Sequence, residues 1–343
     1  MRPWSTPIWL APMGGEAACA PLVAAVAEAG GFGWLGGAYL APARLAEVID
    51  QIRARTGRPF GVNLFCPQDW QRDDAREAAF LAALAPFHTE LGQPPPALPE
   101  RFEEDFEAQL AVLIDRSVPV IGFTFGDPGA GRVAALHARG AVVVGTATQV
   151  REARQLAASG VDAVIAQGAE AGAHRGSFLG ARDEGLVGTM ALVPQVVDAI
   201  GLPVIAAGGI ADARGVAASQ ALGASAVAIG SAFLLADECP LSSAYRSALM
   251  RAQDHQTVLT KAFSGRWARG LANRYTQALA PLVERGELPD FPIPNALTRP
   301  LRQASAKAGR ADALSLWAGQ ATPLARPGSA AAIVQRLAMG WHE

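Results

Sequence analysis

The sequence predicts an α/β fold, a parallel β-barrel of eight βα units with an additional helical cap or substrate domain. Short apolar segments alternate along the chain with Ala-, Leu- and Arg-rich helical patterns, which is typical of βα units. Eight such segments can be found, the number of strands in a TIM (β/α)8 barrel. Half of the 343 residues are hydrophobic, which is ample for one large core. A doubly wound parallel sheet stays open as the alternative, because a strand count from one sequence is uncertain.

The expected strands are short apolar runs of the kind that strands buried on both faces show. Three of them directly follow a proline, at Pro59, Pro119 and Pro203, where a missing N–H is tolerated. In chain order the expected strands are Ile8–Ala11, Phe32–Leu35, Phe60–Phe65, Val120–Phe125, Val142–Gly145, Ala163–Gln167, Val204–Ala207 and Ala226–Gly230.

Helical patterns fill the intervals between these strands, as a βα repeat requires. They are Leu22–Ala29, Pro42–Thr56, Arg132–Arg139, Val150–Ser159, Ala213–Leu222 and Ser243–Ala252.

Two regions depart from the repeat. Between the third and fourth strands lie two helical stretches, Ala75–Leu91 and Arg101–Arg116, separated by three consecutive prolines. After Ala252 the pattern stays helical and loop-like, with a last amphipathic stretch near Ala330–Leu337. Neither region shows the alternation of a strand, so we expect no strands in either.

We therefore expect two parts in the chain. Residues 1–66 and 118–252 would form the barrel, and residues 67–117 and 253–343 would form a helical cap on the substrate side. The alternative is that the additional helices only thicken the outer layer of the barrel.

Composition argues against several classes of partner. The net charge is -2 and no basic run occurs, so we expect no binding of nucleic acid and no binding to a membrane. No apolar stretch approaches a membrane span, and the apolar residues near the N-terminus are too few for a signal peptide. Cys19, Cys66 and Cys239 are widely spaced and suit a reducing compartment. We therefore expect a cytoplasmic protein.

The stretch Asp162–Gly176 is the strongest candidate for a site. Its apolar first half is an expected strand that ends at Gln167, and glycines and His174 follow in the loop. In parallel barrels the loops after the strands carry the chemistry, so His174 is the candidate catalytic residue. The alternative is that the Ala and Gly residues only form a compact loop and that His174 is exposed to solvent.

Two late loops suggest a phosphate site. Gly208 and Gly209 follow the seventh expected strand, and Gly230 and Ser231 follow the eighth. These two loops frequently bind phosphate in TIM barrels, because glycine lets backbone N–H groups approach the ligand. Plain turns are the alternative interpretation.

Two neutral amides stand near strand ends, Asn63 within the third strand and Gln167 at the end of the sixth. A buried amide needs hydrogen-bond partners, and two that face one cavity suit a heteroaromatic ring such as a flavin. Either one alone could be an ordinary core amide.

Other motifs are weaker. The glycines of GGFGWLGG have the spacing of a dinucleotide fingerprint, but a helical pattern precedes them and an apolar run lies inside them. We interpret them as turn glycines around the second strand. No set of His, Asp, Glu and Cys residues has metal-ligand spacing, and the other four histidines fit structural or solvated roles.

Taken together, these segments resemble the nitronate monooxygenase family, which are FMN-containing TIM barrels. The matching text is APMGG from Ala11, PFGVNLF from Pro59, GTAT from Gly145, AQGAEAGAHRG from Ala166, PVIAAGGIADARG from Pro203, ALGASAVAIGSAFL from Ala221 and KAFSGRWARG from Lys261. LWAGQ from Leu316 is similar as well, so the resemblance spans nearly the whole chain.

The resemblance implies roles for particular residues. His174 would be the catalytic base, or a hydrogen-bonding residue near flavin N5. Two departures from the family pattern are Ala173, where a glycine is usual, and Ser231, where a threonine is usual. The positions implied to bind FMN are Pro12, Met13, Asn63, Gln167, Gly172, Gly208, Gly209, Ala228, Ile229, Gly230 and Ser231.

The implied activity is the oxidation of alkyl nitronates, such as propionate-3-nitronate, or of nitroalkanes by FMN and O₂, giving carbonyl compounds and nitrite. The first alternative is an NAD(P)H-dependent FMN reductase of the quinone or enoyl-acyl-carrier-protein type, since the flavin motifs are shared. The second is a non-catalytic flavin carrier. The oligomeric state stays open between a monomer and a homodimer.

Overall fold

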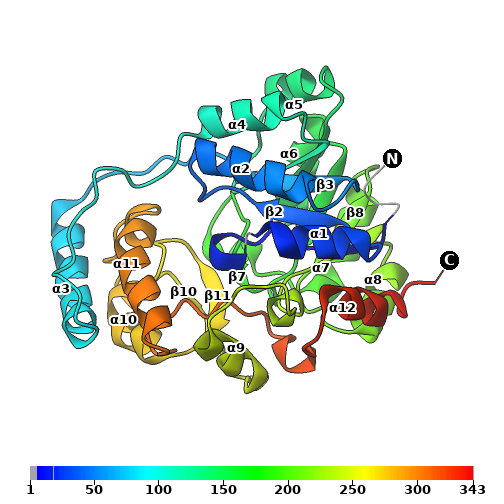
Figure 1. Cartoon of the computed structure of the whole chain (residues 1–343). Helices are drawn as coiled ribbons and strands as arrows, with labels where there is room; N and C mark the ends of the chain where they lie inside the picture. Colours follow the sequence, from blue (N-terminus) through cyan, green and yellow to red (C-terminus); the bar gives the residue numbers. More distant parts are fainter. Residues whose placement is uncertain (1–5, 18, 343) are drawn as a thin grey trace.

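A computed structural model of the chain describes residues 6–17 and 19–342. Eight parallel strands form a barrel, with helices around it (Figure 1). The strands are paired in the order β1-β9-β8-β6-β5-β4-β3-β2. Main-chain hydrogen bonds between Phe32 and the Ile8–Leu10 strand bring the two ends of this sheet together. The barrel strands are β1 (Ile8–Leu10), β2 (Gly33–Gly36), β3 (Phe60–Phe65), β4 (Val120–Thr124), β5 (Val142–Ala147), β6 (Ala163–Gln167), β8 (Val204–Ala207) and β9 (Ala226–Ile229).

All eight strands expected from the sequence are present, to within two residues at their ends. Almost all of their residues are buried, because the barrel interior covers one face and the helices cover the other. Aromatic rings fill part of the interior, with Trp34 5.8 Å from Trp9 and 5.7 Å from Phe32 between ring centroids. A Cβ atom at Gly61 or Gly122 would lie 2.6–2.7 Å from the Trp34 ring, so these strand positions must be glycine.

The outer layer contains most of the expected helices. It also contains α7, which the sequence reading did not specify, because Pro194 interrupts its pattern. The last helix, α12, packs against α1, α8 and β1, so the end of the chain completes the outer layer of the barrel. The helices of this layer are α1 (Ala20–Glu28), α2 (Pro42–Arg53), α4 (Phe106–Asp115), α5 (Ala130–His137), α6 (Val150–Ala158), α7 (Thr189–Ala199), α8 (Ala213–Ala221) and α12 (Ala330–Ala338). Helix α9 (Ser243–Met250) packs instead against the short turns Phe233–Leu235 and Thr322–Leu324.

A second hydrophobic core joins three helices beside the barrel. Helix α3 (Asp74–Glu90) from the insertion packs against α11 (Ile293–Lys307), next to α10 (Arg274–Glu284) (Figure 1). The residues at the centre of this core are Phe80, Leu84, Phe87, Tyr275, Ile293 and Leu297. The two parts of the chain outside the βα repeat are thus packed together.

The expectation that residues 253–343 contain no strand is wrong. Strands β10 (Thr257–Thr260) and β11 (Ala268–Leu271) form an antiparallel pair, and β11 also pairs with β7 (Ala173–His174). These strands are short, and their polar and apolar residues do not alternate, so the sequence carries no strand signal. They form because pairing with neighbouring strands supplies their main-chain hydrogen bonds.

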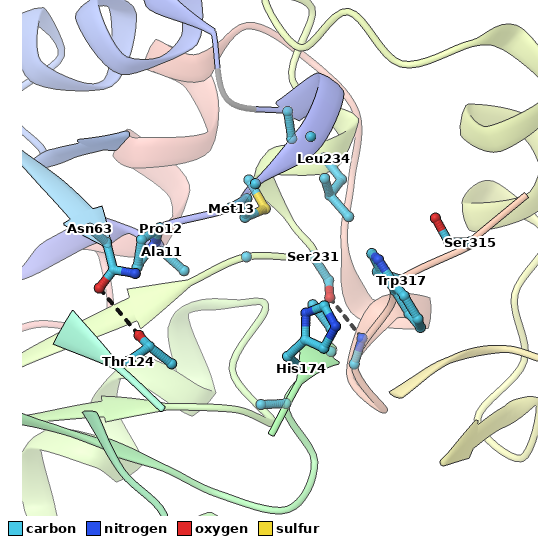
Figure 2. A pocket seen from close by; sticks show the side chains of 18 of the residues that line it. Ala11, Pro12, Met13, Asn63, Thr124, His174, Ser231, Leu234, Ser315 and Trp317 are labelled. Atoms are coloured by element: carbon cyan, nitrogen blue, oxygen red, sulfur yellow. Dashed lines mark hydrogen bonds between the residues drawn. The ribbon is translucent and has the colours of Figure 1, made fainter. Parts of the chain in front are cut away.

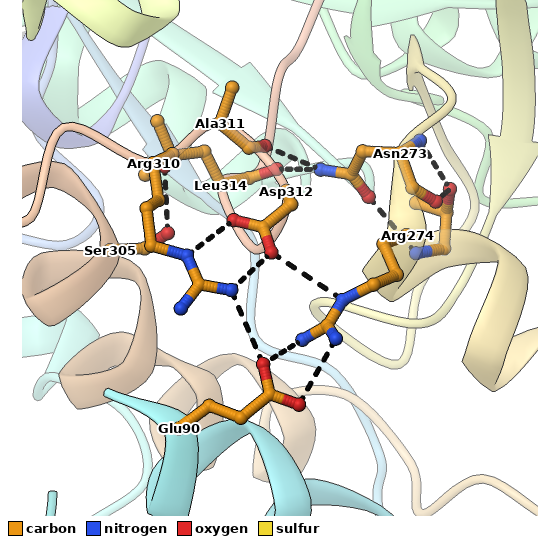
Figure 3. A network of polar contacts seen from close by, with 9 residues as sticks. Glu90, Asn273, Arg274, Ser305, Arg310, Ala311, Asp312 and Leu314 are labelled. Carbon is orange, nitrogen blue, oxygen red and sulfur yellow. Dashed lines mark hydrogen bonds and ion pairs between the residues drawn. The ribbon is translucent and has the colours of Figure 1, made fainter. Parts of the chain in front are cut away.

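Four charged side chains connect α3 to the C-terminal segment. Glu90 at the end of α3 contacts Arg274 and Arg310, and Asp312 accepts from Arg310 and contacts Arg274 (Figure 3). All four groups remain 30–47% exposed, so solvent screens their attraction. The network therefore contributes little to the free energy of folding and mainly orients α3 relative to the C-terminal segment.

Within the described residues, no helix has both the length and the apolar composition needed to cross a membrane.

Candidate active site

A cavity of about 820 Å³ lies between the carboxyl ends of the barrel strands and helix α11. All but one of the residues proposed from the sequence line this cavity. Figure 2 shows Pro12, Met13 and Asn63 on one side, with His174 and Ser231 facing them. The others that line it are Gln167, Gly172, Gly208, Gly209, Ala228 and Gly230.

Ile229 is the exception. Its side chain is 1% exposed and packs into the core between the strands and the outer helices. Side chains alternate along a strand, so Ala228 points to the barrel interior and Ile229 points away from it. Only the main chain of Ile229 can be considered for ligand binding.

A row of polar side chains crosses the strand ends. The Thr124 hydroxyl donates to Asn63 Oδ1 at 3.2 Å (Figure 2). It also lies 3.3 Å from the Thr146 hydroxyl. The Gln167 amide is partly used within the protein, because Nε2 donates to the His174 carbonyl and Oε1 accepts from Gly176 N–H. Gln167 thus holds the loop that carries His174.

The two late glycine loops meet at the same end of the cavity. Gly208 and Gly209 have φ angles of +100° and +71°, which favour glycine. The Ser231 hydroxyl oxygen accepts a hydrogen bond from Gly319 N–H at 2.9 Å, which leaves its proton available to a ligand (Figure 2). A Cβ atom at Gly172 would lie 2.5 Å from Gly319 N, so the two chain segments require glycine to approach this closely.

The position of His174 is fixed from two sides. Strand β7 pairs with β11, where His174 is opposite Ala268. The next residue, Arg175, is 2% exposed and donates to the carbonyls of Gly168, Gln167 and Gly185. These bonds hold the loop after β6 in one conformation.

The His174 ring has aromatic and cationic neighbours. The rings of Phe125 and Trp317 each lie 5.6 Å from it, centroid to centroid. The Arg266 guanidinium lies 3.9 Å from the centroid of Phe125 and donates to Gln68 Oε1 and the Ser177 carbonyl.

Burial, followed by the positive charges of Arg266 and Arg302, lowers the pKa of His174 to about 3. The ring is therefore neutral at physiological pH, with one nitrogen protonated and the other able to accept a proton.

Several cavity residues lie outside the sequence-based assignment. Arg299 and Arg302 project from α11, and Trp317 comes from the LWAGQ segment. Tyr39 also lines the cavity, and its buried hydroxyl has no hydrogen-bond partner in the part of the chain that the structure describes. Burial raises the pKa of Tyr39 to about 12, so the phenol stays protonated and can donate.

Other candidate chemistries find no support among residues 6–17 and 19–342. No group of three His, Cys, Asp or Glu residues there could hold a metal ion. His88 bonds the Pro94 carbonyl, His137 pairs with Asp162, and neither these nor His255 lines the cavity. The glycines of GGFGWLGG lie on and around β2, where a Cβ at Gly33 would meet Val23 O at 2.4 Å.

Comparison with known proteins finds relatives that match almost the whole chain. The profile of the family described as nitronate monooxygenase matches residues 3–340. A probable nitronate monooxygenase from Staphylococcus aureus (strain Newman) is 41% identical over 305 residues, which are 89% of this chain and 85% of that protein.

Solved structures are similar over almost the same length. A nitroalkane oxidase from Streptomyces ansochromogenes is 40% identical, with a TM-score of 0.90 over 97% of this chain and 94% of the other. FabK from Thermotoga maritima is more distant, at 28% identity and a TM-score of 0.73 over 96% and 91% of the two chains.

Proposed function

Because this chain belongs to the nitronate monooxygenase family, we propose that it is a flavin enzyme that oxidises alkyl nitronates with FMN and O₂. In the net reaction two nitronate anions and one O₂ give two carbonyl compounds and two nitrite ions, so each carbon next to nitrogen gains one oxygen atom and each C–N bond breaks. The observation that carries the proposal is the position of His174, a neutral histidine in the same cavity as the glycine loops after β8 and β9.

The residues present fit FMN. A volume of about 820 Å³ lies within the range of small-molecule sites, roughly 300–1,000 Å³. Gly208, Gly209, Gly230 and Ser231 would hold the phosphate, because open glycine loops and a free hydroxyl proton suit an anion. Asn63 and the strand-end hydroxyls would face the ring. No second nucleotide fingerprint offers a place for an adenine half, so FMN is preferred over FAD.

In this proposal the barrel, residues 1–66 and 118–252, holds the cofactor. Within residues 67–117 and 253–343, the substrate side would come from the segments outside the barrel layer, with Arg299, Arg302 and Trp317 at the cavity wall, whereas α4 and α12 belong to that outer layer. Bound flavin would supply the electron transfer from nitronate and the reaction with O₂.

The chain's own residues would handle the proton and the charge. A neutral nitroalkane must lose its α-proton before oxidation, and the neutral His174 ring has a lone pair to accept it. Because the pKa of His174 is about 3, the ring is a weak base, and its protonated form depends on the nitronate anion that forms beside it. The positive charges of Arg299 and Arg302 favour the nitronate anion that results. Phe125 and Trp317 cover the sides of the His174 ring and limit access of water.

The low pKa of His174 makes a prediction about pH. A base must be neutral to act, and His174 is neutral far below pH 7. We therefore expect kcat/KM for a neutral nitroalkane to show no acid limb between about pH 5 and 8. Initial rates of nitrite formation measure this, with a preformed nitronate as the parallel substrate. An acid limb in this range for the nitroalkane alone would contradict the assignment.

Two measurements on the purified protein test the proposed function. Denaturation should release one FMN per chain, identified by chromatography, and FAD would contradict the cofactor assignment. Anaerobic mixing with propionate-3-nitronate should bleach the flavin absorbance, and NADPH should not. Bleaching by NADPH alone would favour the reductase alternative, to which the likeness to FabK gives some weight.

A further inference from the structure

The turn at residues 261–266 presents a serine to His174. Ser264 is 1% exposed, and its hydroxyl oxygen lies 2.9 Å from His174 Nε2. The same hydroxyl donates to the Arg266 carbonyl at 3.1 Å and accepts from Arg266 N–H at 3.3 Å. Because three groups contact this one buried oxygen, the single hydroxyl proton has few directions in which it can point.

Counting donors and acceptors assigns the proton between the two side chains. A hydroxyl has one proton to donate and two lone pairs that accept. The Arg266 carbonyl can only accept, so it takes the Ser264 proton, and Arg266 N–H occupies one lone pair. The remaining lone pair of Ser264 needs a donor, and Nε2–H of His174 is the group that faces it.

We propose that Ser264 is a positioning residue that holds His174 in the Nε2–H tautomer, so that Nδ1 is the nitrogen that accepts a proton in the cavity. Nδ1 has no hydrogen bond to a described residue, and the ring itself lines the cavity. The inference rests on the proposed function in one respect, that His174 acts as a base.

Hydrogen bonds to the neighbouring residues fix the position of Ser264. Tyr275 Oη donates to the Ala262 carbonyl at 3.0 Å, and Thr298 Oγ1 donates to the Phe263 carbonyl at 2.7 Å. Gly265 follows with a φ of +82°, and a Cβ there would lie 2.6 Å from Phe291 N. Helices α10 and α11 thus fix the turn, and the turn fixes the hydroxyl.

The charge state of the ring explains why a tautomer must be chosen. Burial, and then the cations Arg266 and Arg302, disfavour a doubly protonated His174, so the resting ring carries one proton and holds a second one only while the nitronate anion lies beside it. If the proton of the resting ring were on Nδ1, the ring nitrogen that does not contact Ser264 would be a donor and could not take the α-proton of a nitroalkane. The Ser264 hydroxyl decides between these two forms.

The holoenzyme allows a direct test by NMR. In protein labelled with ¹⁵N-histidine, long-range ¹H–¹⁵N correlations distinguish the two tautomers, and His174→Asn identifies the His174 signals. We expect the Nε2–H pattern in the wild-type protein and a mixture or the Nδ1–H pattern in Ser264→Ala. Ser264→Thr keeps the hydroxyl and should keep the wild-type pattern. An Nδ1–H pattern in the wild-type protein overturns the inference without any variant.

Kinetics add a second readout. Loss of the partner that orients a metal-bound histidine typically costs roughly 10- to 100-fold in activity, and we expect kcat of Ser264→Ala on a neutral nitroalkane to fall by about the same factor. Its KM and flavin content should change little, and its loss on a preformed nitronate should be smaller. Ser219→Ala is the matched control, since Ser219 is 2% exposed and donates only to the Gly215 carbonyl within α8.

The possible results separate this inference from the proposed function. If Ser264→Ala keeps both the Nε2–H pattern and the wild-type kcat, Ser264 does not position His174. If the wild-type protein does not oxidise nitronates, the proposed function fails, and the tautomer of His174 still decides the role of Ser264.

Discussion

The variant His174→Asn is expected to lose about 10²- to 10⁴-fold in kcat/KM on a neutral nitroalkane and to keep most of its activity on the matching nitronate. The physical reason is that asparagine can still donate a hydrogen bond to Ser264 but cannot accept a proton at neutral pH. A supplied nitronate has already lost its α-proton and does not need the base. Steady-state rates of nitrite formation with nitroethane and with ethylnitronate measure the difference.

His137→Asn is a matched control for this experiment. His137 pairs with Asp162, its side chain is 39% exposed, and it does not line the cavity, so both activities should stay at the wild-type level. An equal loss of both activities in His174→Asn would make His174 an electrostatic or orienting residue for the anion. No loss, with flavin still bound, would remove His174 from the active site.

The barrel could be predicted from the sequence because its strands carry a local signal. A parallel strand buried on both faces is a continuous apolar run, and each of the eight runs is a strand in the structure. The helices α10 and α11 carry a weaker signal, since Pro281 and Pro300 interrupt them. Strand β7 has only two residues and exists because Ala268 lies beside His174, which no local pattern shows.

The residues of the candidate site likewise divide into those with a local sequence signal and those without one. Asn63, Gln167 and the late glycines follow strands, and the carboxyl ends of parallel strands meet at one edge, so residues far apart in sequence could be expected together. Ser264 and Arg302 reach the site from the turn and helix after the βα repeat. Ser264 lies within the KAFSGRWARG segment that carries the family resemblance, but the resemblance implied no role for it, and an arginine on a helix has no sequence pattern that distinguishes it from a surface residue.

The second large effect is expected from Gly209→Val, which should lose most of its flavin while the barrel stays folded. Gly209 has a φ of +71°, a conformation that a β-branched residue adopts only at a cost of about 1–3 kcal/mol. A Cβ there would lie 3.5 Å from Glu170 Cβ, which is ordinary van der Waals contact, so the expected effect comes from the backbone strain and from the methyl groups beyond Cβ. The strained loop would withdraw its N–H groups from a phosphate, or the added methyl groups would occupy its place.

Flavin occupancy, measured as the ratio of flavin to protein absorbance, decides this prediction together with circular dichroism. Gly30→Val is the matched control, because Gly30 has a similar φ of +84° and open space around its Cβ but lies outside the cavity. Both variants carry comparable backbone strain, so a general loss of stability would lower flavin content in both. Loss in Gly209→Val alone would assign the effect to the phosphate loop. Full occupancy with wild-type affinity in Gly209→Val would show that this loop does not hold the phosphate.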